Sequence, residues 1–292
     1  MSEQDVRSVF PEQDRAEFNA FFPSPYSLGQ FVSSTTGAQP VTYPAPTVGR
    51  RRKILVVATE ERYMRMANGK KFSTGNHPVE TLLPMYHIDA AGFEMDVATV
   101  AGYSAKFEMW AMPPQDALVQ QTFTKYLPKF EQPLKLDEVV AGLGEDSPYA
   151  GVFLPGGHGA MLGLPESKAL GQLLAWTMDT RRVLAVICHG PAALLAARTL
   201  EDRQAFLFSG YNICAFPDEL DRQTPTIGYI PGPMPWYIGE KLKPLGVNII
   251  NQDITGRCHQ DRNVFTGDSP LASDALGHMV AKALLSGMGQ GV

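Results

Sequence analysis

Short apolar runs that alternate with helical segments are the feature that most constrains the fold of this chain. Three such runs lie at residues 54–58, 151–154 and 183–187, and residues 93–99 are predicted to form a further strand. Runs of this kind are typical of parallel strands, because those strands are buried on both faces. Since helical patterns follow them, the sequence predicts an α/β fold with a mostly parallel sheet and helices on both faces.

Two segments depart from this alternation. Residues 1–50 are rich in Pro, Ser, Thr and aromatic residues without periodicity, and we expect an extended arm that packs its Phe and Tyr side chains onto the body or a partner subunit. Prolines at 113, 114, 128 and 133 are expected to break residues 104–148 into short helices. The predicted organisation is an N-terminal arm (1–50) and one α/β domain (51–292) with an inserted subdomain at about 104–148.

Composition excludes several classes of protein. The 292 residues are 44% hydrophobic with a net charge of −5, which argues against a disordered chain and against a dedicated nucleic-acid binder. No window holds 18 consecutive apolar residues, and the acidic, polar start resembles neither a secretory signal nor a transit peptide. Three cysteines do not form a disulfide framework. We therefore expect a soluble, cytoplasmic protein.

Cys188 lies in the strongest chemical motif. A predicted buried strand ends at this cysteine, and His189, Gly190 and Pro191 lead into the next helix. This layout is that of a nucleophile elbow, in which a sharp strand-to-helix turn exposes a reactive side chain. The helix N-terminus favours a thiolate, and a second donor or cation is expected to help lower the pKa of the thiol.

The other two cysteines lack this setting. Cys214 lies in an apolar, strand-like run and is expected to be an inert core thiol. Cys258 has Arg257 and His259 as neighbours, but no strand and helix frame it, so we expect a loop thiol.

A glycine-rich loop follows the strand at 151–154. Gly156 and Gly157 would allow backbone N–H groups to converge on a substrate oxygen, as in an oxyanion hole. A dinucleotide loop is the alternative, but that fingerprint needs an acidic residue at the end of the next strand. Cys188 occupies that position, which argues against nucleotide binding.

Several acidic residues could take part in proton transfer. Glu80 begins a helix at the same edge of the sheet, and an apolar pocket would hold its carboxyl group protonated. Asp218 or Asp221 could orient a histidine. A further group, His87, Asp89 and Glu94, matches no standard metal-binding spacing, so we predict no metal site there.

These motifs together resemble the ThiJ/PfpI superfamily. The resemblance is closer to its heat-shock chaperone branch, also called glyoxalase III or protein deglycase, and it covers nearly the whole chain. It rests on the Cys188 and Gly156 motifs, on Glu80, and on four further segments: NAFFPS (19–24), KFSTGNHP (71–78), WAMP (110–113) and TGDSP (266–270).

The resemblance implies a homodimer with a flavodoxin-like core and a cofactor-independent enzyme. It implies Cys188 as the nucleophile, Glu80 as the acid/base carboxylate, and a triad completed by His189 and Asp221. The implied reaction converts methylglyoxal to lactate, and the same chemistry would reverse early glycation adducts on proteins and nucleotides. The branch also binds unfolding client proteins as a holdase chaperone.

One feature of that branch is changed in this chain. Some members bind zinc through two histidines and a glutamate, and the matching positions here are Asp89, Glu94 and Tyr126. Because imidazole is a better zinc ligand than phenol or carboxylate, we predict no zinc at these positions.

Two alternatives stay open. The chain could be a stress chaperone whose cysteine is incidental, or a cysteine amidase or aminopeptidase, since a cysteine beside a histidine suits both mechanisms. A glutaminase would need a His–x–Glu pair after the cysteine. The comparable run, His77 to Glu80, lies before it.

Overall fold

The computed structural model describes residues 7–44, 53–201 and 204–289. A seven-stranded sheet forms the centre, in the order β12-β13-β9-β8-β3-β6-β7. All neighbouring strands are parallel except β12 and β13, which form an antiparallel edge. The strands are β3 (Lys53–Val57), β6 (Glu94–Thr99), β7 (Leu134–Lys135), β8 (Tyr149–Leu154), β9 (Val183–Ile187), β12 (Cys258–Asp261) and β13 (Val264–Gly267). The predicted α/β class with a mostly parallel sheet is confirmed.

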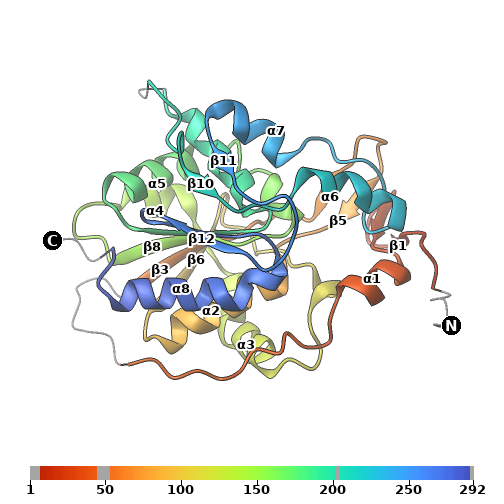
Figure 1. The fold of residues 1–292 in the computed structure, drawn as a ribbon, viewed down its shortest axis with the longest axis horizontal. Coiled ribbons are helices and arrows are strands. Elements are labelled where there is room, and N and C mark those ends of the chain that lie inside the picture. Colours follow the sequence, from red (N-terminus) through yellow and green to blue (C-terminus); the bar gives the residue numbers. More distant parts are fainter. Residues whose placement is uncertain (1–6, 45–52, 202–203, 290–292) are drawn as a thin grey trace.

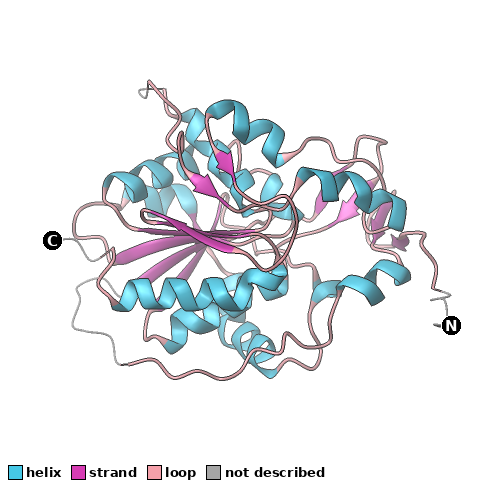
Figure 2. Ribbon diagram, viewed as in Figure 1, coloured by secondary structure: helices cyan, strands magenta, loops and turns pink. Residues whose placement is uncertain are grey.

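Helices cover both faces of this sheet (Figure 2). One face carries α2 (Pro78–Ala90), α3 (Ala117–Glu131) and α8 (Ser273–Leu285), and the other carries α4 (Leu136–Ala141), α5 (Lys168–Asp179) and the 3₁₀ helix η3 (Gly190–Thr199) (Figure 1). Strand β3 shows why both faces are apolar. Ile54 and Val56 point into one core, and Leu55 and Val57 point into the other.

Shorter elements surround the carboxyl edge of the sheet. A four-stranded sheet joins β1 (Glu12–Asp14), β2 (Ala20–Phe22), β5 (Lys71–Ser73) and β4 (Tyr63–Arg65) in that order, next to α1 (Pro25–Phe31). A parallel pair joins β10 (Asn212–Ile213) and β11 (Asn248–Ile249). Helices α6 (Asp218–Gln223) and α7 (Ile238–Leu242) and the 3₁₀ turns η1 (Met109–Ala111), η2 (His158–Met161), η4 (Thr224–Ile227), η5 (Lys243–Leu245) and η6 (Pro270–Ala272) complete the described residues.

The N-terminal segment differs from the expected arm. It contributes β1, β2 and α1, short regular elements that the absence of periodicity in the sequence did not predict. Strand β2 pairs in parallel with β5, which lies fifty residues later in the chain. A strand of three residues is too short to show strand periodicity in the sequence, and β2 is held by a partner that is distant in the chain. Residues 1–6 and 45–50 lie outside the described residues.

The segment 104–148 also differs in detail. Pro128 was expected to break a helix, but it lies inside α3. The side chains of Pro128 and of Thr124, four residues earlier, are both exposed, so the carbonyl that loses its partner lies on the solvent side of the helix. Strand β7 of this segment extends the edge of the main sheet. The division of the chain into an arm, a domain and a subdomain stays a prediction.

No helix among the described residues is long and apolar enough to cross a membrane.

Candidate active site

The candidate site lies at the carboxyl ends of the central strands, where side chains following parallel strands converge. Cys188 directly follows β9, the loop with Gly156 and Gly157 follows β8, and Glu80 lies in the first turn of α2. The side chains of Cys188 and Glu80 are buried, and so are both glycines. The structure thus brings together three elements that are far apart in the sequence.

The backbone of Cys188 is strained. Its φ angle is +57°, in the left-handed region that residues other than glycine rarely adopt. Such a conformation costs on the order of 1–3 kcal/mol and persists only where the surroundings hold it. Here the N–H of Cys188 donates to the carbonyl of Gly267 (2.9 Å), and its carbonyl accepts from the N–H of Phe216 (2.9 Å). This is the sharp turn expected of a nucleophile elbow.

His189 connects the cysteine to a buried carboxylate. Its Nδ1 lies 3.3 Å from Sγ of Cys188, and its Nε2 lies 3.0 Å from Oδ2 of Asp221. If Nε2–H donates to the carboxylate, the hydrogen bonds assign Nδ1 as an unprotonated acceptor that faces the thiol. This is the arrangement of a nucleophile, a base and an orienting acid.

Asp221, rather than Asp218, faces the histidine. Although burial opposes ionisation, the electrostatic interaction with His189 and hydrogen bonds from His158 and His189 hold the pKa of Asp221 well below its usual range. Asp218 instead accepts the backbone N–H groups of Gly239 (2.7 Å) and Glu240 (2.9 Å) at the start of α7. Its contacts are those of a residue that stabilises a helix N-terminus.

Glu80 is fully buried, and burial raises its pKa from 4.5 to about 8. The thiol of Cys188 and the N–H of Gly157 face its carboxyl group, but neither oxygen has a hydrogen-bond partner of good geometry among the described residues. The carboxyl group is therefore protonated at neutral pH and can donate a proton to a bound ligand.

Gly156 allows this close arrangement. A Cβ atom at this position would lie 2.0 Å from Oε2 of Glu80 and 2.8 Å from Cβ of Cys188. Any larger residue would therefore push the carboxyl group and the cysteine apart. The N–H of Gly157 is directed towards Glu80, so the oxyanion-hole role expected for these two glycines stays a prediction.

The environment of Cys188 does not lower the pKa of its thiol, contrary to the expectation for a helix N-terminus. Burial raises that pKa well above its usual value, and Glu80, Asp221 and Glu108 raise it further because their carboxylates are ionised at the high pH where the thiol titrates. The charged groups that act most strongly on this thiol are carboxylates rather than the expected cation. The resting thiol is therefore uncharged at neutral pH, and Nδ1 of His189 is the neighbouring atom that could accept its proton.

The sequence missed two buried groups of this site. His158 lies in the glycine-rich loop. Its Nε2 is 3.3 Å from Oδ1 of Asp221, and its ring centroid is 3.9 Å from that of His189. Glu108 accepts a hydrogen bond from Thr74 (2.7 Å) and lies 4.0 Å from Nδ1 of His158, and burial raises its pKa to about 7. The glycines around His158 could have indicated that it lies in the site, whereas no sequence pattern marks Glu108 as buried.

His77 is a third buried group. It occupies the N-cap position of α2, and burial followed by the charge of His158 lowers its pKa to about 3. Its Nδ1 has no hydrogen-bond partner within the described part of the chain. The ring is therefore neutral, and Nδ1 is available to a ligand.

The positions that the family resemblance associates with a zinc site, Asp89, Glu94 and Tyr126, do not fit a metal ion. Both carboxylate oxygens of Asp89 lie 2.7 Å from Nζ of Lys125, and the hydroxyl of Tyr126 donates to Oδ1 at 2.7 Å. An ammonium group thus takes the place that a cation would need. Glu94, the third position, is exposed, and none of the three positions carries an imidazole.

The remaining cysteines lie outside the site. Cys214 is fully buried, as expected for a core thiol. Cys258 was expected in a loop, but it lies in the edge strand β12, where its thiol donates to the carbonyl of Ala272 at 3.4 Å. The sequence does not reveal this strand because β12 lies at the edge of the sheet, where, among the described residues, it pairs with β13 alone.

Fold and site together define an α/β protein with a cysteine at a strained strand-to-helix turn and a histidine–carboxylate pair beside it. Residues 72–212 match the DJ-1/PfpI family. The protein/nucleic acid deglycase HchA of Escherichia coli O1:K1 is 53% identical over 280 residues, which cover 96% of this chain and 97% of that protein. HchA of strain HS is 54% identical over 276 residues, 94% and 96% of the two chains. The chain belongs to the DJ-1/PfpI family.

Solved structures show the same fold at low sequence identity. Glyoxalase III from Candida albicans superposes with a TM-score of 0.62 at 21% identity and covers 79% of this chain and 96% of its own. The Rapid Encystment Protein 24 kDa of Francisella tularensis gives 0.66 at 16% identity, with 80% and 99% covered.

Replacing Glu80 tests its protonated state. Between about pH 4.5 and 8 the folded protein binds a proton at Glu80 that the unfolded chain does not, so folding stability falls as pH rises through this window. We expect Glu80→Gln to be more stable than the wild type, with a difference in unfolding free energy that grows from pH 5 to pH 8. Urea unfolding at both pH values measures it. The exposed Glu131→Gln is the control, and a difference independent of pH would contradict a protonated Glu80.

Proposed function

We propose that this chain is a cysteine-dependent deglycase and glyoxalase that converts methylglyoxal to lactate and removes early glycation adducts from proteins and nucleotides. The observation that carries the proposal is the buried group of Glu80, Cys188 and His189, which combines a nucleophile, an unprotonated nitrogen and a protonated carboxyl group. The names of the HchA relatives support the deglycase activity, and the glyoxalase III structure shares the fold.

The first step forms a sulfur–carbon bond. His189 accepts the thiol proton at Nδ1, and the sulfur of Cys188 adds to the aldehyde carbon of methylglyoxal. Glu80 donates its proton to the aldehyde oxygen, and a hemithioacetal results. Asp221 holds the ring of His189 in place and stabilises its positive charge.

The next steps move one proton between two carbons. The Glu80 carboxylate removes the C–H proton of the hemithioacetal while protonated His189 gives its proton to the ketone oxygen, which gives an enediol. Glu80 then returns its proton to the adjacent carbon, the hydroxyl proton of the former aldehyde carbon passes to His189, and a lactyl thioester forms on Cys188. Water then hydrolyses the thioester, releases lactate and restores the thiol. The sum is one methylglyoxal and one water consumed for each lactate formed.

The same residues can act on an early glycation adduct. In such an adduct the former aldehyde carbon carries a hydroxyl group and the amine of a protein or nucleotide. Attack by the sulfur forms the carbon–sulfur bond and breaks the carbon–nitrogen bond, and the amine leaves with a proton from the site. The hemithioacetal is the one described above, so lactate is again the product.

Substitution of the cysteine tests the nucleophile. We expect Cys188→Ala to lower the rate of lactate formation from methylglyoxal at least about a thousandfold, since no other group can form the thioester. The matched control is Cys258→Ala, which removes a thiol from an edge strand. Lactate formation that persists in Cys188→Ala would contradict the proposal. Hydrolysis of a peptide amide without any lactate would favour the amidase alternative.

Substitution of Asp221 tests the histidine. Asp221→Asn removes the charge that orients His189 and stabilises its protonated form, so we expect kcat to fall by about 10²–10⁴ with the fold intact. Glu219→Gln, an exposed position on the same helix, is the control. An unchanged kcat in Asp221→Asn would show that His189 does not act as the base.

A second candidate function is favoured by the surface of the N-terminal segment. Phe10, Phe18 and Phe31 are 77%, 85% and 58% exposed. Exposed aromatic side chains of this size can hold an unfolding client protein. We propose a holdase activity that does not need Cys188. We also propose that the chain forms a homodimer, as its resemblance to the heat-shock chaperone branch implies.

Replacing two of these phenylalanines tests the holdase. We expect Phe10→Ser with Phe18→Ser to suppress heat-induced aggregation of a client protein less well than the wild type, measured by light scattering. The control is Tyr103→Ser, which removes a 71% exposed aromatic residue elsewhere. Equal suppression by the double variant and the wild type would rule out this surface.

A further inference from the structure

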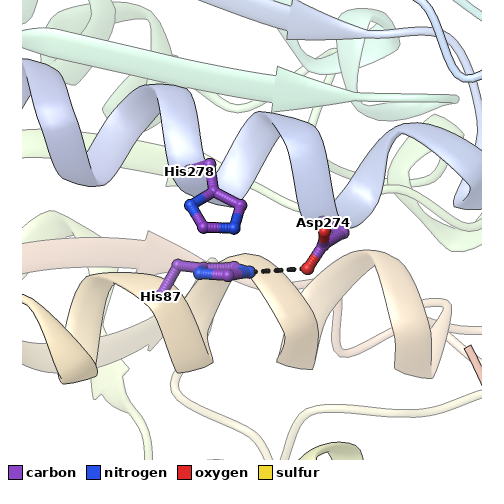
Figure 3. A group of neighbouring side chains, drawn as sticks. All are labelled: His87, Asp274 and His278. Carbon is purple, nitrogen blue, oxygen red and sulfur yellow. Dashed lines mark hydrogen bonds and ion pairs between the residues drawn. The ribbon is translucent and has the colours of Figure 1, made fainter. Parts of the chain in front are cut away.

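A second cluster of histidine and carboxylate side chains lies between α2 and α8, apart from Cys188. His87 comes from α2, and Asp274 and His278 come from α8, one helical turn apart (Figure 3). Nε2 of His87 lies 2.8 Å from Oδ1 of Asp274, and the two imidazole rings are 4.2 Å apart between centroids. One nitrogen or oxygen of each residue lies within 4.8 Å of the others.

Tyr43 of the N-terminal segment orients both rings. Its hydroxyl oxygen lies 2.9 Å from Nδ1 of His87 and 2.8 Å from Nδ1 of His278. Both Nδ1 atoms are thus engaged by the same hydroxyl group, which leaves Nε2 of each ring for another partner. An outer hydrogen bond of this kind is what a histidine ligand needs to fix its orientation.

The packing of the two helices brings the rings together. Gly277 of α8 faces His87, and a Cβ atom there would lie 2.4 Å from Cδ2 of the ring. The glycine thus permits α8 to approach α2 closely enough for Asp274 and His278 to reach the same point. His87 itself is fully buried, whereas the side chain of Asp274 is 46% exposed.

We propose that His87, Asp274 and His278 bind a divalent transition-metal ion such as Zn²⁺ or Co²⁺. Two imidazole nitrogens and one carboxylate oxygen form a donor set that suits zinc and cobalt, whereas Mg²⁺ and Ca²⁺ prefer oxygen ligands. Three protein ligands leave one position of a tetrahedron for water, on the side where Asp274 reaches solvent. The metal replaces the proton that Nε2 of His87 shares with Asp274.

This site is distinct from the positions that match the zinc site of some relatives. Asp89 lies two residues after His87 on α2, but its carboxylate is paired with Lys125 and Tyr126. The new site uses α8 and Tyr43 instead. It is independent of the proposed enzyme function, because none of its residues contacts Cys188, His189 or Glu80 among the interactions described above.

Cobalt titration of the full chain tests the site. We expect one Co²⁺ per chain, with a visible d–d spectrum that lacks the thiolate-to-cobalt charge-transfer band a cysteine ligand would give. His278→Asn and Asp274→Asn should abolish this spectrum at the wild-type saturating concentration. Tyr43→Phe should weaken binding about tenfold or more, because it removes the hydrogen bonds that orient both rings. His259→Asn is the matched control and should bind as the wild type does.

Thermal unfolding provides a second measurement. Saturating Zn²⁺ should raise the Tm of the wild type and leave that of His278→Asn unchanged, since the metal stabilises only a protein that binds it. Lactate formation by metal-free His278→Asn should equal that of the wild type, which shows that the variant is folded. Absence of Co²⁺ binding, or binding that persists in His278→Asn and Asp274→Asn, would overturn the proposal. A charge-transfer band would assign the ion to a cysteine instead.

Discussion

The close approach of Glu80 to Cys188 across Gly156 is the contact on which the rest of the site depends. The space for a side chain at position 156 is taken by Oε2 of Glu80 and Cβ of Cys188. The ends of β8 and β9 and the first turn of α2 must therefore converge within a few ångströms. The positive φ angle of Cys188 is the backbone cost of this arrangement, and the buried hydrogen bonds of its N–H and carbonyl groups hold it.

Burial at this point decides where protons lie before a substrate binds. Desolvation raises the pKa of Glu80 to about 8 and that of Glu108 to about 7, and it raises that of Cys188 as well. Asp221 differs because two histidines donate to it, so it keeps its negative charge. The site therefore rests with an uncharged thiol beside an uncharged acid, and the negative charge of Asp221 orients His189. In the proposed mechanism, reactivity comes from proton transfer from Cys188 to His189 rather than from a preformed thiolate.

Much of this architecture could be predicted from local patterns. The apolar runs predicted the central strands, and Cys188 followed from a strand that ends at a cysteine before a helix. The pattern could not reveal the sign of the electrostatic field at the sulfur, because Glu108 and Asp221 reach it from distant segments. The N-terminal strands were missed for a similar reason, since β2 pairs with β5 rather than with a local neighbour. Properties set by a short stretch of chain were predictable, whereas those set by tertiary contacts were not.

Helix α2 connects the two polar clusters of the molecule. Glu80 lies in its first turn at the carboxyl edge of the sheet, and His87 lies two turns later against α8. At each end a glycine from another element, Gly156 or Gly277, removes the Cβ atom that would keep the polar group away. The two ends differ in their partners. Glu80 has a thiol and no good hydrogen bond, which suits proton transfer. Tyr43 holds Nδ1 of His87, and Nε2 faces Asp274, which suits a ligand of fixed orientation. The same helix can therefore carry a reactive carboxyl group and a metal-binding imidazole, because the packing around each one sets its chemistry.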